Sequence, residues 1–204
     1  MMVTRTESCG KTRYRIYLDG EPAFILYKGE MKKMGIREGE SISAGTEETI
    51  RSEILYRRAR LRAMHLLEGM DRTEEGLCEK LRQSEYPEDV IEKAVAYVRS
   101  FGYINDARYA ENFILSRRDS KSRRELEALL AKKGVSRENI DQAFSICYSE
   151  EEEQKAIQKI LRKKRVDPKT AEGDELRKIY GYLARKGFRY DAIRQVIQNH
   201  MENA

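Results

Sequence analysis

The chain has 204 residues, of which 40% are apolar and 37% are charged, and its formal net charge is +5. This balance is typical of helices that bury a narrow apolar stripe and expose a wide charged face. No apolar run approaches the roughly 18 residues of a membrane helix, and the start MMVTRTESCGK has no apolar core. We therefore expect no membrane span, no secretory signal and a cytoplasmic location.

Residues suited to catalysis or metal binding are few and scattered. Cys9, Cys78 and Cys147 are far apart and form no C-x-x-C pair, which favours reduced thiols. His65 lies inside a predicted helix and His200 lies near the C-terminus. The sequence has no phosphate-binding loop, dinucleotide fingerprint or zinc-protease motif. We expect no cofactor, no metal and no enzymatic activity, and an enzyme with an unrecognised site is the weakest hypothesis.

Residues 1–48 differ in kind from the rest of the chain. Apolar residues alternate with other residues over Tyr14–Leu18 and over Phe24–Lys28, on either side of an Asp-Gly pair. Such alternation predicts a small N-terminal β-hairpin. The segment MGIREGESIS adds either a short third strand or a turn. A hairpin alone is marginal in water, so we expect it to dock on the first helices or on a partner. The helical region is predicted to begin near Thr49.

The remaining sequence repeats itself. LAKKGVSRENI at Leu130–Ile140 and LARKGFRYDAI at Leu183–Ile193 share Leu, Ala, Lys, Gly and Ile at matching positions. A third copy lies upstream, since Leu77 and Leu81 have the spacing of Leu126 and Leu130. We predict a mainly α fold of tandem three-helix repeats that form an elongated curved array. The predicted domains are the N-terminal extension at 1–48 and repeats at 49–104, 105–149 and 150–204.

The middle repeat carries the clearest helix signals. Asn105 or Asp106 can cap its first helix. Ser122 and Glu125 have the spacing of a capping box, in which the serine oxygen accepts from the glutamate backbone and the glutamate reaches back. Gly134 is suited to end the second helix, because glycine takes a left-handed conformation without steric cost.

The other two repeats depart from this pattern. In the first, Thr73 and Gly76 stand where the middle repeat has its serine and glutamate, which predicts a weaker cap. In the last, a longer connection at Val166–Glu175 separates the first two helices. The acidic run Glu150–Glu153 lies at a predicted helix start, which favours an interaction with the helix dipole over metal ligation.

Basic residues cluster at corresponding ends of successive predicted helices. The run SRRDSKSRR contains a single acidic residue, and RRAR and ILRKKR are further clusters. Each cluster alone fits an ordinary solvated face, but a repeat array can align them into one stripe that faces phosphates or acidic side chains. The candidates for contact with a partner or DNA are Arg57, Arg58, Arg60, Arg117, Arg118, Lys121, Arg123, Arg124, Lys132, Lys133, Arg162, Lys163, Lys164, Arg165, Arg185 and Lys186.

Two runs resemble a known family. G-Y-I-N-D-x-R-Y-A at Gly102–Ala110 and R-K-G-F-x-Y-D-x-I at Arg185–Ile193 resemble the RecX family, the regulators of the recombinase RecA. The resemblance covers about Ile50–Asn199, and the hairpin looks like the N-terminal extension of longer members. The first repeat departs from the family pattern, because RTEEGL at Arg72–Leu77 replaces the more common R-S-x-x-E-L.

The resemblance implies a regulator without catalysis. Members are tandem three-helix repeats that lie along the groove of the RecA filament on single-stranded DNA. They modulate, mostly inhibit, ATP hydrolysis and strand exchange in recombination and DNA repair. The expected partners are therefore the RecA filament and single-stranded DNA, bound directly or through the filament, by a monomeric chain that makes several contacts at once. The alternative is a direct DNA-binding protein of helix-turn-helix type that acts without a recombinase.

Several motif residues also have structural interpretations. Tyr103, Ile104, Tyr109 and Phe113 fall at apolar helix positions or in the connecting turn. We therefore expect them to join the first and second repeats rather than to stack on bases. Asn105 is expected to cap a helix rather than to bind a ligand.

Overall fold

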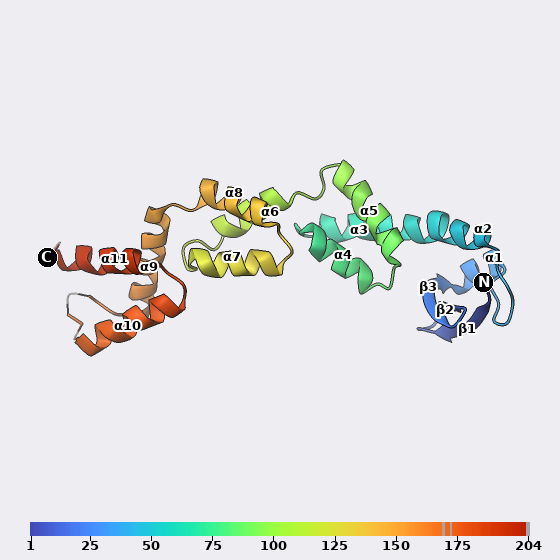
Figure 1. Cartoon of the computed structure of the whole chain (residues 1–204), viewed down its shortest axis with the longest axis horizontal. Helices are drawn as coiled ribbons and strands as arrows, with labels where there is room; N and C mark the ends of the chain where they lie inside the picture. The colour runs from blue at the N-terminus through green and yellow to red at the C-terminus, as the bar shows by residue number, and fades with distance from the viewer. Residues whose placement is uncertain (169, 172, 203–204) are drawn as a thin grey trace. The chain divides into compact units, whose positions relative to one another are not determined.

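The computed structural model describes residues 1–168, 170, 171 and 173–202, with side chains placed as far as Asn199 (Figure 1). Two compact units follow one another along the chain, Met1–Ile104 and Asn105–Ala204. The predicted fold class is confirmed: the chain is mainly helical, its helices form three-helix groups, and a small antiparallel sheet stands at the N-terminus.

The sheet contains the predicted hairpin and one further strand. Its strands are β1 (Val3–Ser8), β2 (Arg13–Leu18) and β3 (Glu21–Tyr27), paired antiparallel in that order. Asp19 and Gly20 join β2 to β3 with φ angles of 50° and 94°, the two positive values that a tight type I′ turn requires.

The start of the helical region was predicted at the wrong place, and of the two alternatives for MGIREGESIS the turn forms instead of the strand. MGIREGESIS supplies only an isolated bridge from Ser41 to Met2, and the third strand is β1. β1 reads V-T-R-T-E-S with Val3 as its one fully buried residue, so its alternation was too weak to detect. Helices begin at α1 (Lys28–Met34), not near Thr49, because Glu30 accepts a hydrogen bond from the Tyr27 amide at 2.7 Å and fixes the first turn.

The sheet and the first three-helix group share one core. The helices are α2 (Ala44–Thr49), a π-helical segment (Ile50–Leu55) that continues without a break into α3 (Tyr56–Glu68), α4 (Glu74–Arg82) and α5 (Glu88–Ser100). Ile16 and Leu26 of the sheet are fully buried in the same cluster as Leu55, Leu77 and Ile91. The hairpin therefore docks on the first helices, as predicted.

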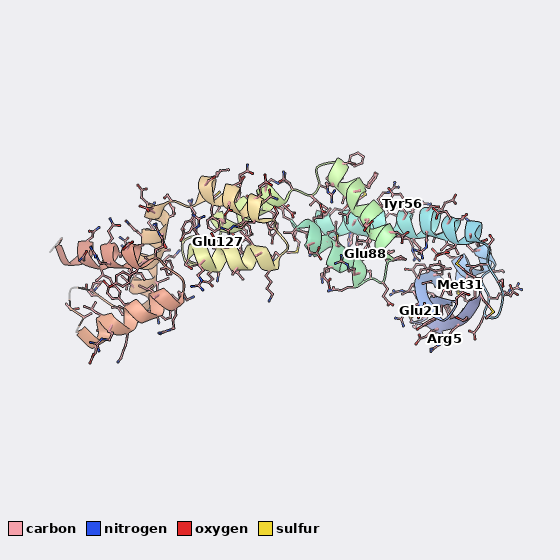
Figure 2. All side chains as sticks on the ribbon, in the orientation of Figure 1. Arg5, Glu21, Met31, Tyr56, Glu88 and Glu127 are labelled. Atoms are coloured by element: carbon pink, nitrogen blue, oxygen red, sulfur yellow. The ribbon has the colours of Figure 1, made fainter. Side chains whose placement is uncertain are left out.

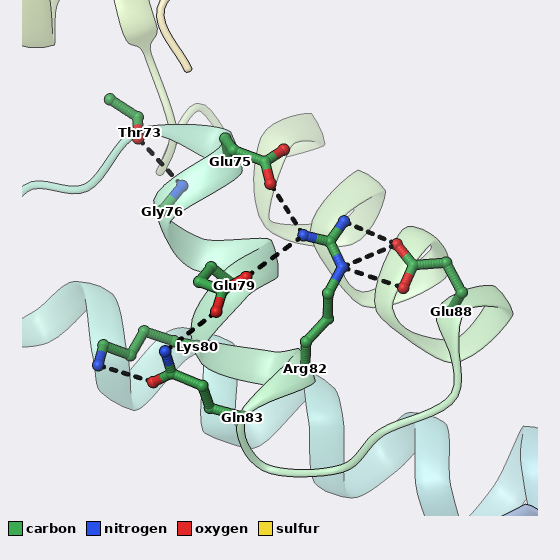
Figure 3. A network of polar contacts seen from close by, with 8 residues as sticks. All are labelled: Thr73, Glu75, Gly76, Glu79, Lys80, Arg82, Gln83 and Glu88. Atoms are coloured by element: carbon green, nitrogen blue, oxygen red, sulfur yellow. Dashed lines mark hydrogen bonds and ion pairs between the residues drawn. The ribbon is translucent and has the colours of Figure 1, made fainter. Parts of the chain in front are cut away.

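An arginine links α4 to α5 in this group (Figure 3). The Arg82 guanidinium donates to both carboxylate oxygens of Glu88, at 2.8 to 3.3 Å, and to Glu75 at 2.8 Å. The same view shows Thr73 capping α4, since its hydroxyl accepts from the Gly76 amide at 3.1 Å. The hydrogen bonds from Arg82 hold the pKa of Glu88 below its usual value.

The second unit contains two three-helix groups, each with its own core. Their helices are α6 (Asp106–Leu115), α7 (Arg123–Lys132), α8 (Arg137–Cys147), α9 (Glu150–Lys164), α10 (Gly173–Arg185) and α11 (Tyr190–Glu202). The repeated positions are core: Leu81, Leu130 and Leu183 have no exposed surface. The sequence repeat therefore encodes matching buried positions.

The predicted helix signals of the middle group are largely confirmed. The Asn105 side chain accepts from the Arg108 amide at 2.9 Å, and Gly134 follows α7 with a φ of 79°. Only half of the capping box forms. The Ser122 hydroxyl accepts from the Glu125 amide at 3.1 Å, but the carboxylate of Glu125 accepts from Lys121 instead of reaching back. Within the connection at Val166–Glu175, positions 169 and 172 lie outside the described residues, as does the side chain of residue 200.

Candidate partner-binding surfaces

The start of α7 is basic, against the preference of a helix. Arg123 and Arg124 occupy its first turn, near the positive end of the helix dipole, where a cation costs about 0.3–1 kcal/mol. Arg123 is compensated, because its Nε donates to Glu127 at 2.8 Å. Figure 2 labels Glu127. Arg124 is exposed, and among the described residues no carboxylate lies within ion-pair distance of it. The Arg124 charge is therefore available to a partner.

The turn between α10 and α11 lies directly against this helix start. The Ser122 hydroxyl donates to the Lys186 carbonyl oxygen at 2.6 Å. Gly187 has a φ of +88°, and a Cβ there would lie 2.9 Å from the Cβ of Arg124 and 3.0 Å from the Ser122 Oγ. Only glycine allows both this conformation and this approach. The glycine of the R-K-G-F run thus joins the second and third three-helix groups.

A basic groove forms where these two segments meet. We call it the α7–α10 groove; it has a volume of about 470 Å³ and is lined by Arg124, Glu125, Ala128, Ala184, Arg185, Lys186 and Gly187. Arg185 is exposed and, like Arg124, has no carboxylate partner among the described residues. Glu125 is shared between Lys121 and Lys186, with the Lys186 Nζ at 3.8 Å. The groove therefore keeps a positive charge that the chain itself does not neutralise.

A second basic cluster surrounds an aromatic side chain of α6. The guanidinium carbon of Arg117 lies 4.1 Å from the Phe113 ring centroid, and the Lys133 Nζ lies 5.8 Å from it. Lys133 is also 5.9 Å from the Tyr109 ring, and Lys132 beside it is exposed. Cation–π contacts at exposed sites contribute about 0.5–1 kcal/mol, so they help to hold these cations beside the rings.

Some of the predicted basic residues serve the fold instead. Arg118 donates to the Cys147 carbonyl oxygen at 2.9 Å and pairs with Glu152 at 3.3 Å, which joins the second group to the start of α9. Lys121 pairs with Glu125 one helical turn away. These two residues are half-buried, so we leave them out of the proposed binding surface.

The three candidate arginines of α3 at positions 57, 58 and 60 also differ in their contacts. Arg58 pairs with Glu30 at 2.9 Å and donates to the Ile25 carbonyl oxygen at 2.7 Å, so it holds α3 against the sheet. The guanidinium carbon of Arg60 lies 4.7 Å from the Tyr97 ring. Arg57 is exposed. The RRAR cluster is therefore not one continuous basic face.

The cluster at the end of α9 has a structural explanation as well. Arg162, Lys163 and Lys164 occupy the last turn, where cations interact favourably with the helix dipole, and the Lys164 Nζ lies 4.0 Å from the Tyr182 ring. Arg165 follows in a left-handed conformation with a φ of 57°. All four residues are exposed, so they remain available to a partner.

The acidic run at the start of α9 holds the third group together. Arg189 donates to Glu153 at 2.8 Å and to Glu150 at 2.9 Å. Glu153 is 2% exposed and also accepts from the Arg189 amide. The Arg189 side chain is 55% exposed, so solvent screens this pair on one side. These carboxylates occupy the first turn, as predicted, and no grouping suited to a metal ion occurs in the described part of the chain.

An exposed aromatic stack after α5 was not predicted. The Phe101 ring centroid lies 4.9 Å from that of Tyr97 and 5.9 Å from that of Tyr103. Phe101 and Tyr103 are 58% and 52% exposed, whereas Ile104 is buried in the core of the first unit. We expected Tyr103 to be covered because it stands in an apolar connecting turn. The adjacent Gly102, with a φ of 69°, was the available signal that the chain reverses there.

The described side chains with shifted pKa values make structural contacts. Burial raises the pKa of the thiols of Cys78 and Cys147, which lowers the thiolate fraction that a nucleophile needs. A hydrogen bond from Tyr17 is the main cause that lowers the pKa of Glu7. Across the described residues, no helix is both long and apolar enough to cross a membrane. Fold and surface together define a helical-repeat protein whose open basic groove is suited to binding.

The chain belongs to the RecX family. Three family models match in order: the first three-helix domain of RecX over 59–97, the second over 105–143 and the third over 150–197. The regulatory protein RecX of Caldanaerobacter subterraneus subsp. tengcongensis is 30% identical over 199 residues, which cover 97% of this chain and 98% of that protein. The regulatory protein RecX of Clostridium beijerinckii is 29% identical over 194 residues, 94% of this chain and 91% of that one.

Solved structures agree on the fold. A crystal structure of a regulatory protein RecX covers 96% of this chain and 98% of its own, with a TM-score of 0.63 and 23% identity. The crystal structure of RecX from Lactobacillus salivarius covers 74% of this chain and 98% of its own, with a TM-score of 0.61 and 24% identity. The relatives are named regulatory proteins.

Proposed function

We propose that this chain binds the RecA filament on single-stranded DNA and lowers its ATPase and strand-exchange activities. Membership in a family of regulatory proteins supports the proposal, as does the resemblance of its two motif runs to regulators of RecA. The observation that carries it is the α7–α10 groove, in which Arg124 and Arg185 have no carboxylate partner among the described residues. Such a surface is complementary to phosphates or to acidic side chains.

The groove is proposed to act together with other exposed cations. Arg117 and Lys133 are held over Phe113, and Arg162 to Arg165 end α9. Each contact of this kind is weak when exposed. Several contacts made by one monomeric chain to one filament add through effective concentration. We propose that the chain acts in the cytoplasm, beside the DNA on which the filament assembles.

An ATPase titration tests the proposal. The purified chain is added to the cognate RecA on single-stranded DNA at increasing molar ratios, and ATP hydrolysis is followed. We expect hydrolysis to slow at a ratio well below one chain per RecA protomer, since one chain contacts several protomers. An unchanged rate at every ratio, with folded chain verified by circular dichroism, would contradict the proposal.

Direct DNA binding remains the second candidate, and the basic start of α7 favours it. A helix that begins with two arginines can point its N-terminal end at phosphates. This candidate predicts binding to duplex DNA with sequence preference and a steep salt dependence, in the absence of RecA. A titration of the same chain into labelled duplexes of different sequence distinguishes the two functions.

A further inference from the structure

A pocket in the first unit lies between the sheet, α3 and the connection from α4 to α5. Its volume is about 260 Å³, and none of its residues belongs to the α7–α10 groove. Three arginines reach it, one from β2 and two from α3, which is unusual because like charges repel unless something compensates them. The residues that line it are Arg13, Ile25, Tyr27, Arg58, Arg62, Ser84, Glu85 and Tyr86.

Arg58 forms a fixed wall of this pocket. Its terminal nitrogens donate to Glu30 and to the Ile25 carbonyl oxygen, and its guanidinium carbon lies 4.9 Å from the Tyr27 ring centroid. The remaining donor, Nε, is buried and has no hydrogen-bond partner among the described residues. Buried donors are nearly always satisfied, so this unpaired Nε leaves the Arg58 guanidinium without its full set of acceptors.

The other two arginines are not neutralised. Arg13 stands at the start of β2, and Arg62 lies one helical turn after Arg58 on α3. Neither has a carboxylate within ion-pair distance in the described ranges. Glu85, the acidic residue among those lining the pocket, is already engaged, because Arg15 donates to its Oε2 at 2.6 and 2.8 Å. With Arg58 offset by its own glutamate, two positive charges remain uncompensated.

A phenol completes the donor set. Tyr86 is half-buried, and its ring lies near the guanidinium groups of the three arginines. Burial raises the pKa of Tyr86 while these guanidinium groups act in the opposite direction. The hydroxyl is therefore protonated at neutral pH and is able to donate a hydrogen bond to an anion.

We propose that this pocket binds a terminal phosphate group, either inorganic phosphate or the phosphomonoester of a nucleoside monophosphate or a 5′-phosphorylated DNA end. Two uncompensated positive charges match the nearly two negative charges of a phosphomonoester, whereas a carboxylate or a phosphodiester carries only one. Guanidinium groups pair with phosphate oxygens through two parallel hydrogen bonds, and several can surround one tetrahedral group. The proposal goes beyond regulation of RecA and does not depend on it.

Calorimetric titration of the full chain with inorganic phosphate tests the site. We expect saturable binding that the double variant R13Q/R62Q weakens at least about tenfold, a loss near 1.4 kcal/mol. The control R57Q removes an exposed arginine of the same helix that does not line the pocket, and its affinity should stay within about twofold of the original. No saturable binding by the original chain, or an equal loss in R57Q, would overturn the proposal.

Competition distinguishes the sources of the phosphoryl group. Thymidine monophosphate and a short oligothymidine, with and without a 5′-phosphate, are titrated against bound phosphate. A monoester site predicts that the unphosphorylated strand competes far less well than the phosphorylated one, and equal competition would contradict it. If circular dichroism shows that R13Q/R62Q does not fold, R62Q alone is compared with R57Q, because both side chains are exposed.

Discussion

The starts of α4 and α7 occupy matching places in the first and second three-helix groups, yet their charges are opposite. α4 begins with Glu74 and Glu75, which suit the positive end of the helix dipole and pair with Arg99 and Arg82. α7 begins with Arg123 and Arg124, which oppose the dipole. The fold does not require the basic version, since α4 forms with the acidic one. We therefore propose that the charge at the start of α7 serves binding.

Reversing the charge of the groove should have the largest effect. R124E/R185E replaces two unpaired cations with anions, so it should weaken binding to the RecA filament at least about tenfold, near 1.4 kcal/mol. Affinity is measured by fluorescence anisotropy of labelled filaments. R177E is the matched control, because Arg177 lies on α10 outside the groove and is 86% exposed. An equal loss of affinity in R177E would show that the effect comes from the net charge of the chain and not from the groove.

The close approach of Gly187 to the start of α7 gives the next effect. G187A should destabilise the second unit by about 1–3 kcal/mol, because alanine is strained at this φ and its Cβ meets Arg124 and Ser122. Urea unfolding and hydrogen exchange of α7 amides measure the loss. G102A carries the positive-φ strain without any atom within 4 Å of the added Cβ, so it should cost less. Equal losses of stability in both variants would show that the close approach of Gly187 to the start of α7 does not contribute to the effect.

Single charge reversals at the starts of α4 and α7 should have smaller effects. They separate the contribution of each charge to binding from its contribution to helix stability. R124E should stabilise α7 by about 0.3–1 kcal/mol while it weakens filament binding, because an anion suits the dipole better than a cation. The reverse change in the matching helix, E75R, should destabilise α4, since it also removes the ion pair with Arg82. Amide hydrogen exchange of each helix reports its local stability. A loss of both stability and binding in R124E would mean that Arg124 serves the fold.

The smallest expected effect is a pH dependence of stability in the first three-helix group, where Arg82 pairs with Glu88. The folded pKa of Glu88 is lowered, chiefly by hydrogen bonds from Arg82, so this pair stabilises the fold above the unfolded carboxyl pKa of about 4.3. The contribution is lost as the pH falls through the lower folded value. Urea unfolding between about pH 6 and pH 3 should therefore show a steeper loss in the original chain than in E88Q. Identical slopes would mean that the pair contributes nothing.

The sequence predicted the repeat and its core because those signals are local. Leu81, Leu130 and Leu183 recur at matching positions of the three repeats and are buried, and caps such as Asn105 act within one turn. The strand β1 was missed since Val3 is its one apolar residue. The start of the helical region was misplaced because a glutamate side chain, not an apolar run, fixes α1.

Which arginines are free was beyond the sequence for a different reason. Arg118 and Arg124 belong to the same SRRDSKSRR run, and composition treats them alike. Arg118 meets the Cys147 carbonyl oxygen and Glu152, whereas Arg124 faces the turn at Gly187. Those neighbours are far away in sequence, so the distinction exists only in the folded chain. A cluster of charged residues in such a repeat therefore indicates a binding surface only where the folded chain leaves those residues without ion-pair partners.

Site-specific photo-cross-linking tests most directly whether the α7–α10 groove contacts the recombinase filament. A photoreactive amino acid replaces Ala128, which lines the groove, or Ser145, an exposed residue of α8 that does not. Both chains are irradiated with RecA filaments on single-stranded DNA. The account predicts that position 128 forms cross-links to RecA or to the DNA in clear excess over position 145. Equal or absent cross-linking at position 128, by a chain that still slows ATP hydrolysis, would contradict it.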